Sequence, residues 1–215
     1  MSIALAARRI KRNLTDYGIA MFLRKGIQYL FQAFYLKRIY RIYRRDLHCG
    51  QWPEPSLEGI DLKVVGSGDT SVIRQIAGME EWLEDGLKEK ISKGLCVAAL
   101  DGPRVAGFNL VAFKEVSIPL LGLKKRLRPH QAWSEQISVD KEFRKKGVAT
   151  ALRYHVFTEL LNRGISRFYG GALLTNIASL KSAQKAGFLQ IADVHYRKIL
   201  NRPGRAWKRI RHETI

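Results

Sequence analysis

A turn between a strand and a helix, at residues 139–152, carries the residues whose types and spacing best suit chemistry. Val139 ends an alternating, strand-like run, and Gly147 precedes an apolar helical pattern. The first amides of a helix lack partners and lie at the positive end of its dipole, so such a turn can bind a diphosphate. Three consecutive cations add charge there: Arg144, Lys145 and Lys146. From the turn alone, a phosphate cradle and an ordinary turn with solvated lysines are equally good interpretations.

The chain around this turn alternates between the periods of strands and helices. Strands are expected over residues 60–65, 95–100, 104–113, 132–139, 167–173 and 188–199, and helices over 69–92, 146–162 and 177–185. This order mixes hairpins with helical crossovers. It predicts an α/β fold in which a mixed, mostly antiparallel central sheet has helices on both faces.

Three short motifs in this order resemble the GCN5-related N-acetyltransferase (GNAT) superfamily. They are Arg144-x-x-Gly147-x-Ala149 after a strand, Asn176-x-x-Ser179, and Ala186-Gly187-Phe188. The order of elements over residues 57–200 also matches that family. The resemblance does not cover residues 1–56 or 201–215.

The resemblance implies an enzyme that uses acetyl-CoA as co-substrate, without a metal. The amides expected to hold the pyrophosphate are those of Arg144, Lys145, Lys146, Gly147, Val148, Ala149 and Thr150. The strand edge from Ile137 to Val139 would pair with the pantetheine arm, and the Ile137 amide would stabilise the oxyanion. Asn176 and Ser179 would contact the pantetheine, although Asn176 is equally suited to cap the following helix.

The family reaction is direct transfer of an acyl group to an amine, which must first lose a proton to a base. Glu135 is the candidate for that base, because its alternation with Trp133 and Ile137 places the three side chains and Val139 on one face. The alternative is a surface glutamate paired with a cation. Ala183 stands where many members have a tyrosine acid. The substitutes to consider are Tyr169, Tyr196 and Ser182.

The segment over residues 116–129 borders the acceptor pocket in this family and is first apolar, then basic. We expect residues 118–123 to form a lid, or only a small hydrophobic tuck. Trp133 and four cations would contact the acceptor: Lys124, Lys125, Arg126 and Arg128. A primary amine on a small molecule, or on a phosphorylated or nucleotide-linked amino sugar, fits this charge. The alternatives are another acyl or aminoacyl donor, an RNA acceptor, or a non-catalytic module that binds nucleic acid or membrane.

Basic residues are concentrated outside the domain that carries the motifs. The formal net charge is +19, and residues 1–56 and 201–215 carry twelve of these charges, so the partners should be anionic. We expect an aromatic-rich helical extension with a Pro-containing linker over residues 1–56, a GNAT-like domain over 57–200 and a basic tail over 201–215.

Residues 27–45 are expected to be helical, because apolar residues recur there at three- to five-residue steps. Such a helix could dock on the domain or on a second copy, lie on an anionic membrane surface, or bind nucleic acid. Two single cysteines, Cys49 and Cys96, suit a reducing compartment. With no signal peptide and no apolar span, the sequence predicts a cytoplasmic protein, with peripheral association at a membrane as an open alternative.

Overall fold

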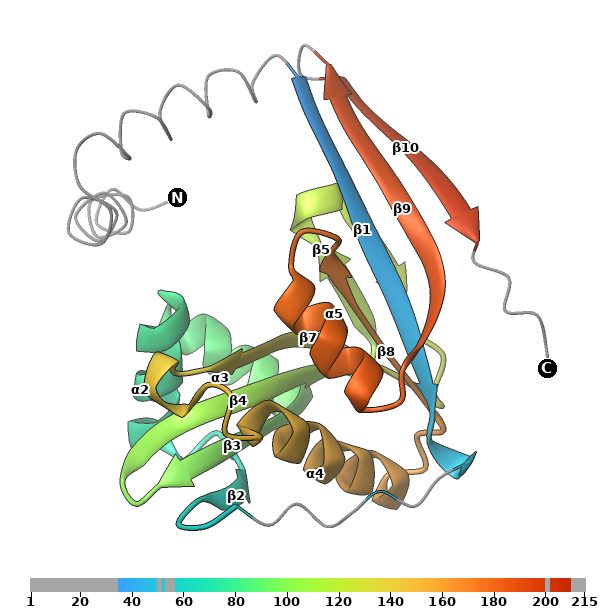
Figure 1. Cartoon of the computed structure of the whole chain (residues 1–215). Helices are drawn as coiled ribbons and strands as arrows, with labels where there is room; N and C mark the ends of the chain where they lie inside the picture. The colour runs from blue at the N-terminus through green and yellow to red at the C-terminus, as the bar shows by residue number, and fades with distance from the viewer. Residues whose placement is uncertain (1–34, 50–51, 53–56, 200–201, 210–215) are drawn as a thin grey trace.

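The computed structural model describes residues 35–49, 52, 57–199 and 202–209, and its core is one eight-stranded sheet (Figure 1). The strands of this sheet are β1 (Tyr35–Asp46), β2 (Asp61–Val64), β3 (Gly94–Asp101), β4 (Arg104–Ala112), β7 (Gln131–Val139), β8 (Arg167–Leu173), β9 (Leu189–Ile199) and β10 (Arg202–Arg209). Their spatial order is β10-β9-β1-β8-β7-β4-β3-β2. Among them only β7 and β8 pair in parallel, so the mixed, mostly antiparallel sheet is confirmed.

Helices cover both faces of this sheet, as expected. The four described α-helices are α2 (Thr70–Glu80), α3 (Glu84–Lys93), α4 (Val148–Asn162) and α5 (Ile177–Lys185). α4 and α5 pack on one face around Phe157, Phe168 and Phe188. α2 and α3 pack on the opposite face of β3 and β4. The helix expected over residues 69–92 is two helices, because Glu81 ends α2 in a left-handed conformation.

A small two-stranded sheet covers the rest of the second face. It consists of β5 (Glu115–Ile118) and β6 (Leu123–Arg126), joined by a 3-10 turn over Pro119–Leu121. Its apolar side chains pack with Ile42, Trp133 and Val194 of the main sheet. The second face of the main sheet is therefore divided between a helical cover and a hairpin cover.

The helix expected over residues 27–45 is wrong for its described part, because residues 35–46 form strand β1. Residues 27–34 lie outside the described residues. β1 lies between β8 and β9 and pairs antiparallel with both (Figure 1). Successive side chains alternate between faces: Ile42 packs under the hairpin, whereas Tyr43 packs in the core under α4 and α5. Tyr and Ile favour a strand, and the two flanking strands satisfy the backbone hydrogen bonds of β1. Together these effects outweigh the helix-like spacing of its apolar residues.

β10 pairs along the outer edge of β9. Both β1 and β10 therefore belong to the same sheet as residues 57–199. The sheet thus extends across the boundaries expected near residues 56 and 200.

Candidate active site

β7 and β8 begin side by side and then diverge. They pair at only three positions, Gln131 with Arg167, Ala132 with Phe168 and Trp133 with Tyr169. Beyond these pairs β7 stays bonded to β4, and β8 stays bonded to β1. We call the region between residues 134–139 and 170–173 the fork. Along the fork, β7 offers a strand edge with no strand partner among the described residues.

A β-bulge in β7 sets the direction of the side chains along the fork. Opposite β4, Leu110 pairs with Gln136 and Val111 pairs with Ser134, so Glu135 is the inserted residue. A bulge reverses the alternation that follows it. Ile137 and Val139 therefore pack in the core on the α4 side, whereas Trp133 packs under the hairpin. The expectation of one shared face for these four residues is wrong for that reason.

Glu135 itself faces α3. Its side chain is 16% exposed, and its Oε2 lies 2.5 Å from Nζ of Lys90. The next residue, Gln136, donates a hydrogen bond of 3.1 Å to Oε2 of Glu80 at the end of α2. The carboxylates nearest the bulge therefore lie toward the helical cover of the second face. An ammonium group can be held there by acidic side chains.

The turn before α4 has the geometry of an anion cradle. Gly147 has φ 87° and Lys145 has φ 66°, so two residues adopt the left-handed conformation just before the helix. The amides of Thr150 and Ala151 donate to the Gly147 carbonyl. The five preceding amides, from residues 145 to 149, have no acceptor within the described part of the chain. Successive free amides at a helix N-terminus fit the diphosphate of coenzyme A.

The cations of this turn have different surroundings. Nε of Arg144 donates a hydrogen bond of 3.1 Å to the Val139 carbonyl, and this bond holds the Arg144 side chain against the end of β7. The Lys146 ammonium lies 5.3 Å from the centre of the Phe143 ring. Lys145 is exposed. Two of the three cations are thus held by the protein itself, beside the free amides.

Residues 61–188 match the family model for the acetyltransferase (GNAT) family, which is more than half of the chain. The chain belongs to this family. A search of curated proteins finds no match. Family membership implies acetyl-CoA as the co-substrate.

Solved structures show the same fold at low sequence identity. A GCN5-related N-acetyltransferase from Sphaerobacter thermophilus is 17% identical with a TM-score of 0.57, covering 81% of this chain and 56% of its own. An acetyltransferase of the GNAT family from Colwellia psychrerythraea is 12% identical with a TM-score of 0.54, covering 73% and 53%. The chain thus spans about half the length of these two structures.

Asn176 and Ser179 cap a helix in this GNAT protein. Oδ1 of Asn176 accepts a hydrogen bond of 3.1 Å from the Ser179 amide at the first turn of α5. This is the capping role expected as the alternative. Contact with pantetheine stays a prediction for both residues.

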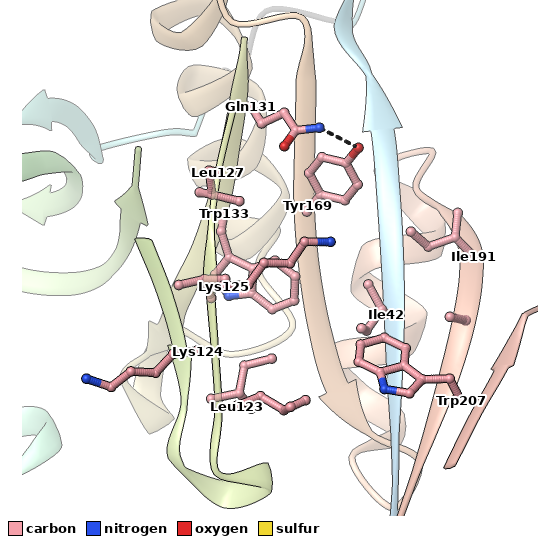
Figure 2. A pocket seen from close by; sticks show the side chains of 13 residues that line it. Ile42, Leu123, Lys124, Lys125, Leu127, Gln131, Trp133, Tyr169, Ile191 and Trp207 are labelled. Atoms are coloured by element: carbon pink, nitrogen blue, oxygen red, sulfur yellow. Dashed lines mark hydrogen bonds between the residues drawn. The ribbon is translucent and has the colours of Figure 1, made fainter. Parts of the chain in front are cut away.

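Ala183 of α5, at the position of the usual GNAT tyrosine, is buried in the core on the α4 side of the sheet. Of the substitutes, Tyr196 is buried beneath the hairpin, and Ser182 accepts a 3.4 Å hydrogen bond from Arg153. Tyr169 belongs to the last pair before the fork, and its hydroxyl accepts a hydrogen bond of 3.3 Å from Nε2 of Gln131 (Figure 2). Of these hydroxyls, Tyr169 lies nearest in the chain to the start of the fork.

Two tyrosines near the fork come from β1 and were missed by the sequence analysis. Tyr43 lies over Gly170 on the α4 side, and Tyr40 lies over Gly171 on the opposite side. Burial raises the pKa of the Tyr40 hydroxyl. The signal in the sequence is Gly170-Gly171 within a strand, because paired glycines there indicate close approach by another segment.

Arg153 of α4 is a second residue that sequence reasoning missed. It is fully buried, and neither Nη atom has a hydrogen-bond partner within the described residues. Its guanidinium carbon lies 5.3 Å from the centre of the Phe188 ring. Burial lowers the pKa of this guanidinium. An arginine inside an otherwise apolar helical stripe was the available signal.

A cavity of about 250 Å³ lies under the β5–β6 hairpin (Figure 2). Lys124, Lys125 and Trp133 line it, as do Tyr169 and Ile118. Two cations expected with them, Arg126 and Arg128, are not among its lining residues. The hairpin thus brings part of the expected acceptor set together above the start of the fork.

The described residues were also searched for metal ligands and for membrane-spanning helices. No group of three or more His, Cys, Asp or Glu side chains among them is arranged to hold a metal ion. None of their helices has the length and hydropathy needed to cross a membrane.

Proposed function

We propose that this GNAT protein transfers an acetyl group directly from acetyl-CoA to a primary amine. The observation that carries the proposal is the run of five free amides at residues 145–149, beside the unpaired edge of β7. An anion-binding turn next to an open strand edge can hold the two ends of one extended thioester. The acceptor class that we favour is a small amine or a phosphorylated or nucleotide-linked amino sugar.

The residues divide the work along the fork. The amides of residues 145–149 bind the diphosphate, and the edge from Ile137 to Val139 pairs with the pantetheine amides. The Ile137 amide would donate to the oxyanion that forms when the amine adds to the thioester carbonyl. Glu135 accepts a proton from the acceptor's ammonium group, either directly or through a water molecule, and the neutral amine then attacks the thioester carbonyl.

The bulge supports this role for Glu135. An inserted residue re-aims its side chain out of the regular alternation. Lys90 fixes the position of the carboxylate by an ion pair. Tyr169 is our candidate to protonate the departing thiolate, with Tyr196 the weaker one because it is buried beneath the hairpin.

Two partners follow from charge. The exposed ammonium groups of Lys124 and Lys125 on the hairpin suit an anionic group of a substrate. Residues 1–50 are expected to contact an anionic membrane surface or a second copy, and because residues 35–46 form β1, the basic residues 1–34 carry this proposal. We place the protein in the cytoplasm, at such a surface.

Thermal unfolding with acetyl-CoA tests the donor site. A ligand present at 100 times its Kd should stabilise the protein by about 2.7 kcal/mol. An unchanged melting temperature in saturating acetyl-CoA would rule out this donor. Release of coenzyme A in the presence of a library of amines then identifies the acceptor.

A further inference from the structure

The cavity under the hairpin begins where the fork begins. Trp133 and Tyr169 form the last pair of β7 and β8, and both side chains line the cavity (Figure 2). The phosphate cradle belongs to the opposite face, at the start of α4. A thioester that enters from the cradle and reaches the start of the fork therefore has its acyl group directed at this cavity.

The walls of the cavity are mostly apolar and come from several strands. Ile42 of β1, Ile191 and Ala192 of β9, and Trp207 of β10 form one side. Val116, Ile118, Leu123 and Leu127 form the other side. The family model ends at residue 188 and begins at residue 61, so the first side is built by parts of the chain outside it. Part of the cavity wall therefore lies outside the residues that the family model matches.

No acidic residue lines the cavity among the described residues. Lys124 and Lys125 are exposed, and Lys124 points away from the other labelled side chains (Figure 2). The ammonium group of an acceptor would find no negative charge in the cavity. Glu135 and Glu80, in contrast, offer two carboxylates on the helical side of the bulge. Charge therefore separates the two substrates: the amine approaches from the helical cover, and an uncharged chain fits under the hairpin.

We infer that the cavity binds the acyl chain of the donor, and that the preferred donor carries a chain of medium length in place of the acetyl group proposed above. This inference rests on the proposed donor site. The 250 Å³ of the cavity is several times the ~30 Å³ that one water molecule takes in the liquid, so it holds a longer chain than an acetyl group. Burying apolar groups favours the longer donor by about fourfold for each methylene.

Binding of two thioether analogues tests this without the unknown acceptor and without hydrolysis. S-octyl-CoA should bind the full-length protein at least about tenfold more tightly than S-ethyl-CoA in calorimetry. Equal affinities would overturn the acyl cavity while leaving the donor site intact. Failure of both analogues to bind would overturn the proposed function itself.

The second measurement compares the affinities of the same two analogues in a variant whose cavity is filled by a larger side chain. Ala192 is 7% exposed and lines the wall beside Ile42, so Ala192→Phe should bring the two affinities together. Ala206→Phe is the matched control, because Ala206 is exposed on β10 and its neighbour Trp207 takes the cavity side. Leu123→Trp on the hairpin repeats the test if Ala192→Phe does not fold. A preference for the octyl chain that survives in the folded filled variant would overturn the assignment.

Discussion

Tyr43 of β1 covers Gly170 of β8 so closely that a Cβ added to the glycine would lie 2.5 Å from Cε2 of the tyrosine. The neighbouring Gly171 has the same relationship with Tyr40 on the other face. Both glycines follow Tyr169, the last residue of β8 that pairs with β7. The strand at one side of the fork is therefore held in place by aromatic rings from the N-terminal strand.

Gly170→Ala should destabilise the protein, because the added methyl group must displace the Tyr43 ring from a packed core. Such overpacking costs about 1–3 kcal/mol. Gly86→Ala in α3 is the control, since nothing lies within 4 Å of its Cβ position and alanine favours a helix. Urea unfolding should show a loss for the first variant and a small gain for the second. A Gly170→Ala protein as stable as wild type would contradict the packing of β1 on β8.

Deletion of residues 1–34 should leave a folded protein, because β1 begins at Tyr35. Deletion through residue 46 removes a strand from the middle of the sheet and leaves β8 and β9 without a shared neighbour. We expect the shorter deletion to give a cooperative melting transition and the longer one to give aggregates. Two soluble, cooperative products would show that β1 is dispensable.

The shorter deletion also tests the membrane proposal. Full-length protein should sediment with vesicles that contain anionic lipid, and the protein lacking residues 1–34 should not, because the deletion removes basic side chains. Zwitterionic vesicles serve as the control. Equal sedimentation of both proteins would place any membrane contact elsewhere.

Asp193 fastens β9 to β1 through two 2.8 Å hydrogen bonds from Arg41, and these bonds lower the pKa of the carboxyl group. A lowered folded-state pKa means that the stabilisation is complete at neutral pH and is lost as the pH falls through that value. Asp193→Asn should therefore cost about 1 kcal/mol at pH 7. The difference from wild type should shrink below about pH 4. Glu89→Gln, which removes an exposed pair with Lys93, should have little effect at either pH.

Glu135→Gln should keep donor binding and lower turnover by roughly 100-fold, because glutamine cannot accept the ammonium proton. The rise of kcat/KM with pH should change shape in this variant. Glu115→Gln on the exposed end of β5 is the control and should behave as wild type. Wild-type kinetics in Glu135→Gln would remove Glu135 as the base.

Gly147 and Gly164 flank α4 and both have positive φ, 87° and 72°. Replacing either with alanine should cost about 1 kcal/mol of stability, because an L side chain is strained in that conformation. Only Gly147→Ala should also weaken acetyl-CoA binding, since Gly147 lies in the run of free amides. Equal affinity of both variants for acetyl-CoA would show that the turn around Gly147 is not part of the donor site.

The sequence predicts the turn at residues 144–147 and the helix after it well, because their signals are local. The alternating run before Val139, the glycine at residue 147 and the apolar stripe behind it are adjacent in the chain. The fork required two facts that are not local. Glu135 becomes a bulge only because Leu110 and Val111 of β4 pair on either side of it, and simple alternation then assigns Ile137 to the wrong face.

β1 could not be predicted from its own residues. Apolar side chains at Ile39 and Ile42 fit a helix as well as a strand. The partners that decide between them, β8 and β9, are more than 120 residues further along the chain. Long-range pairing of this kind overrides local spacing.

The position of β1 also dictates when this molecule can be completed during synthesis. The ribosome releases β1 well before its two neighbours, residues 167–173 and 189–199, because both come more than 120 residues later in the chain. The backbone groups on both edges of β1 therefore stay without their strand partners until β8 and β9 have been made. Native structure on one side of the donor site then appears only after both later strands have been produced.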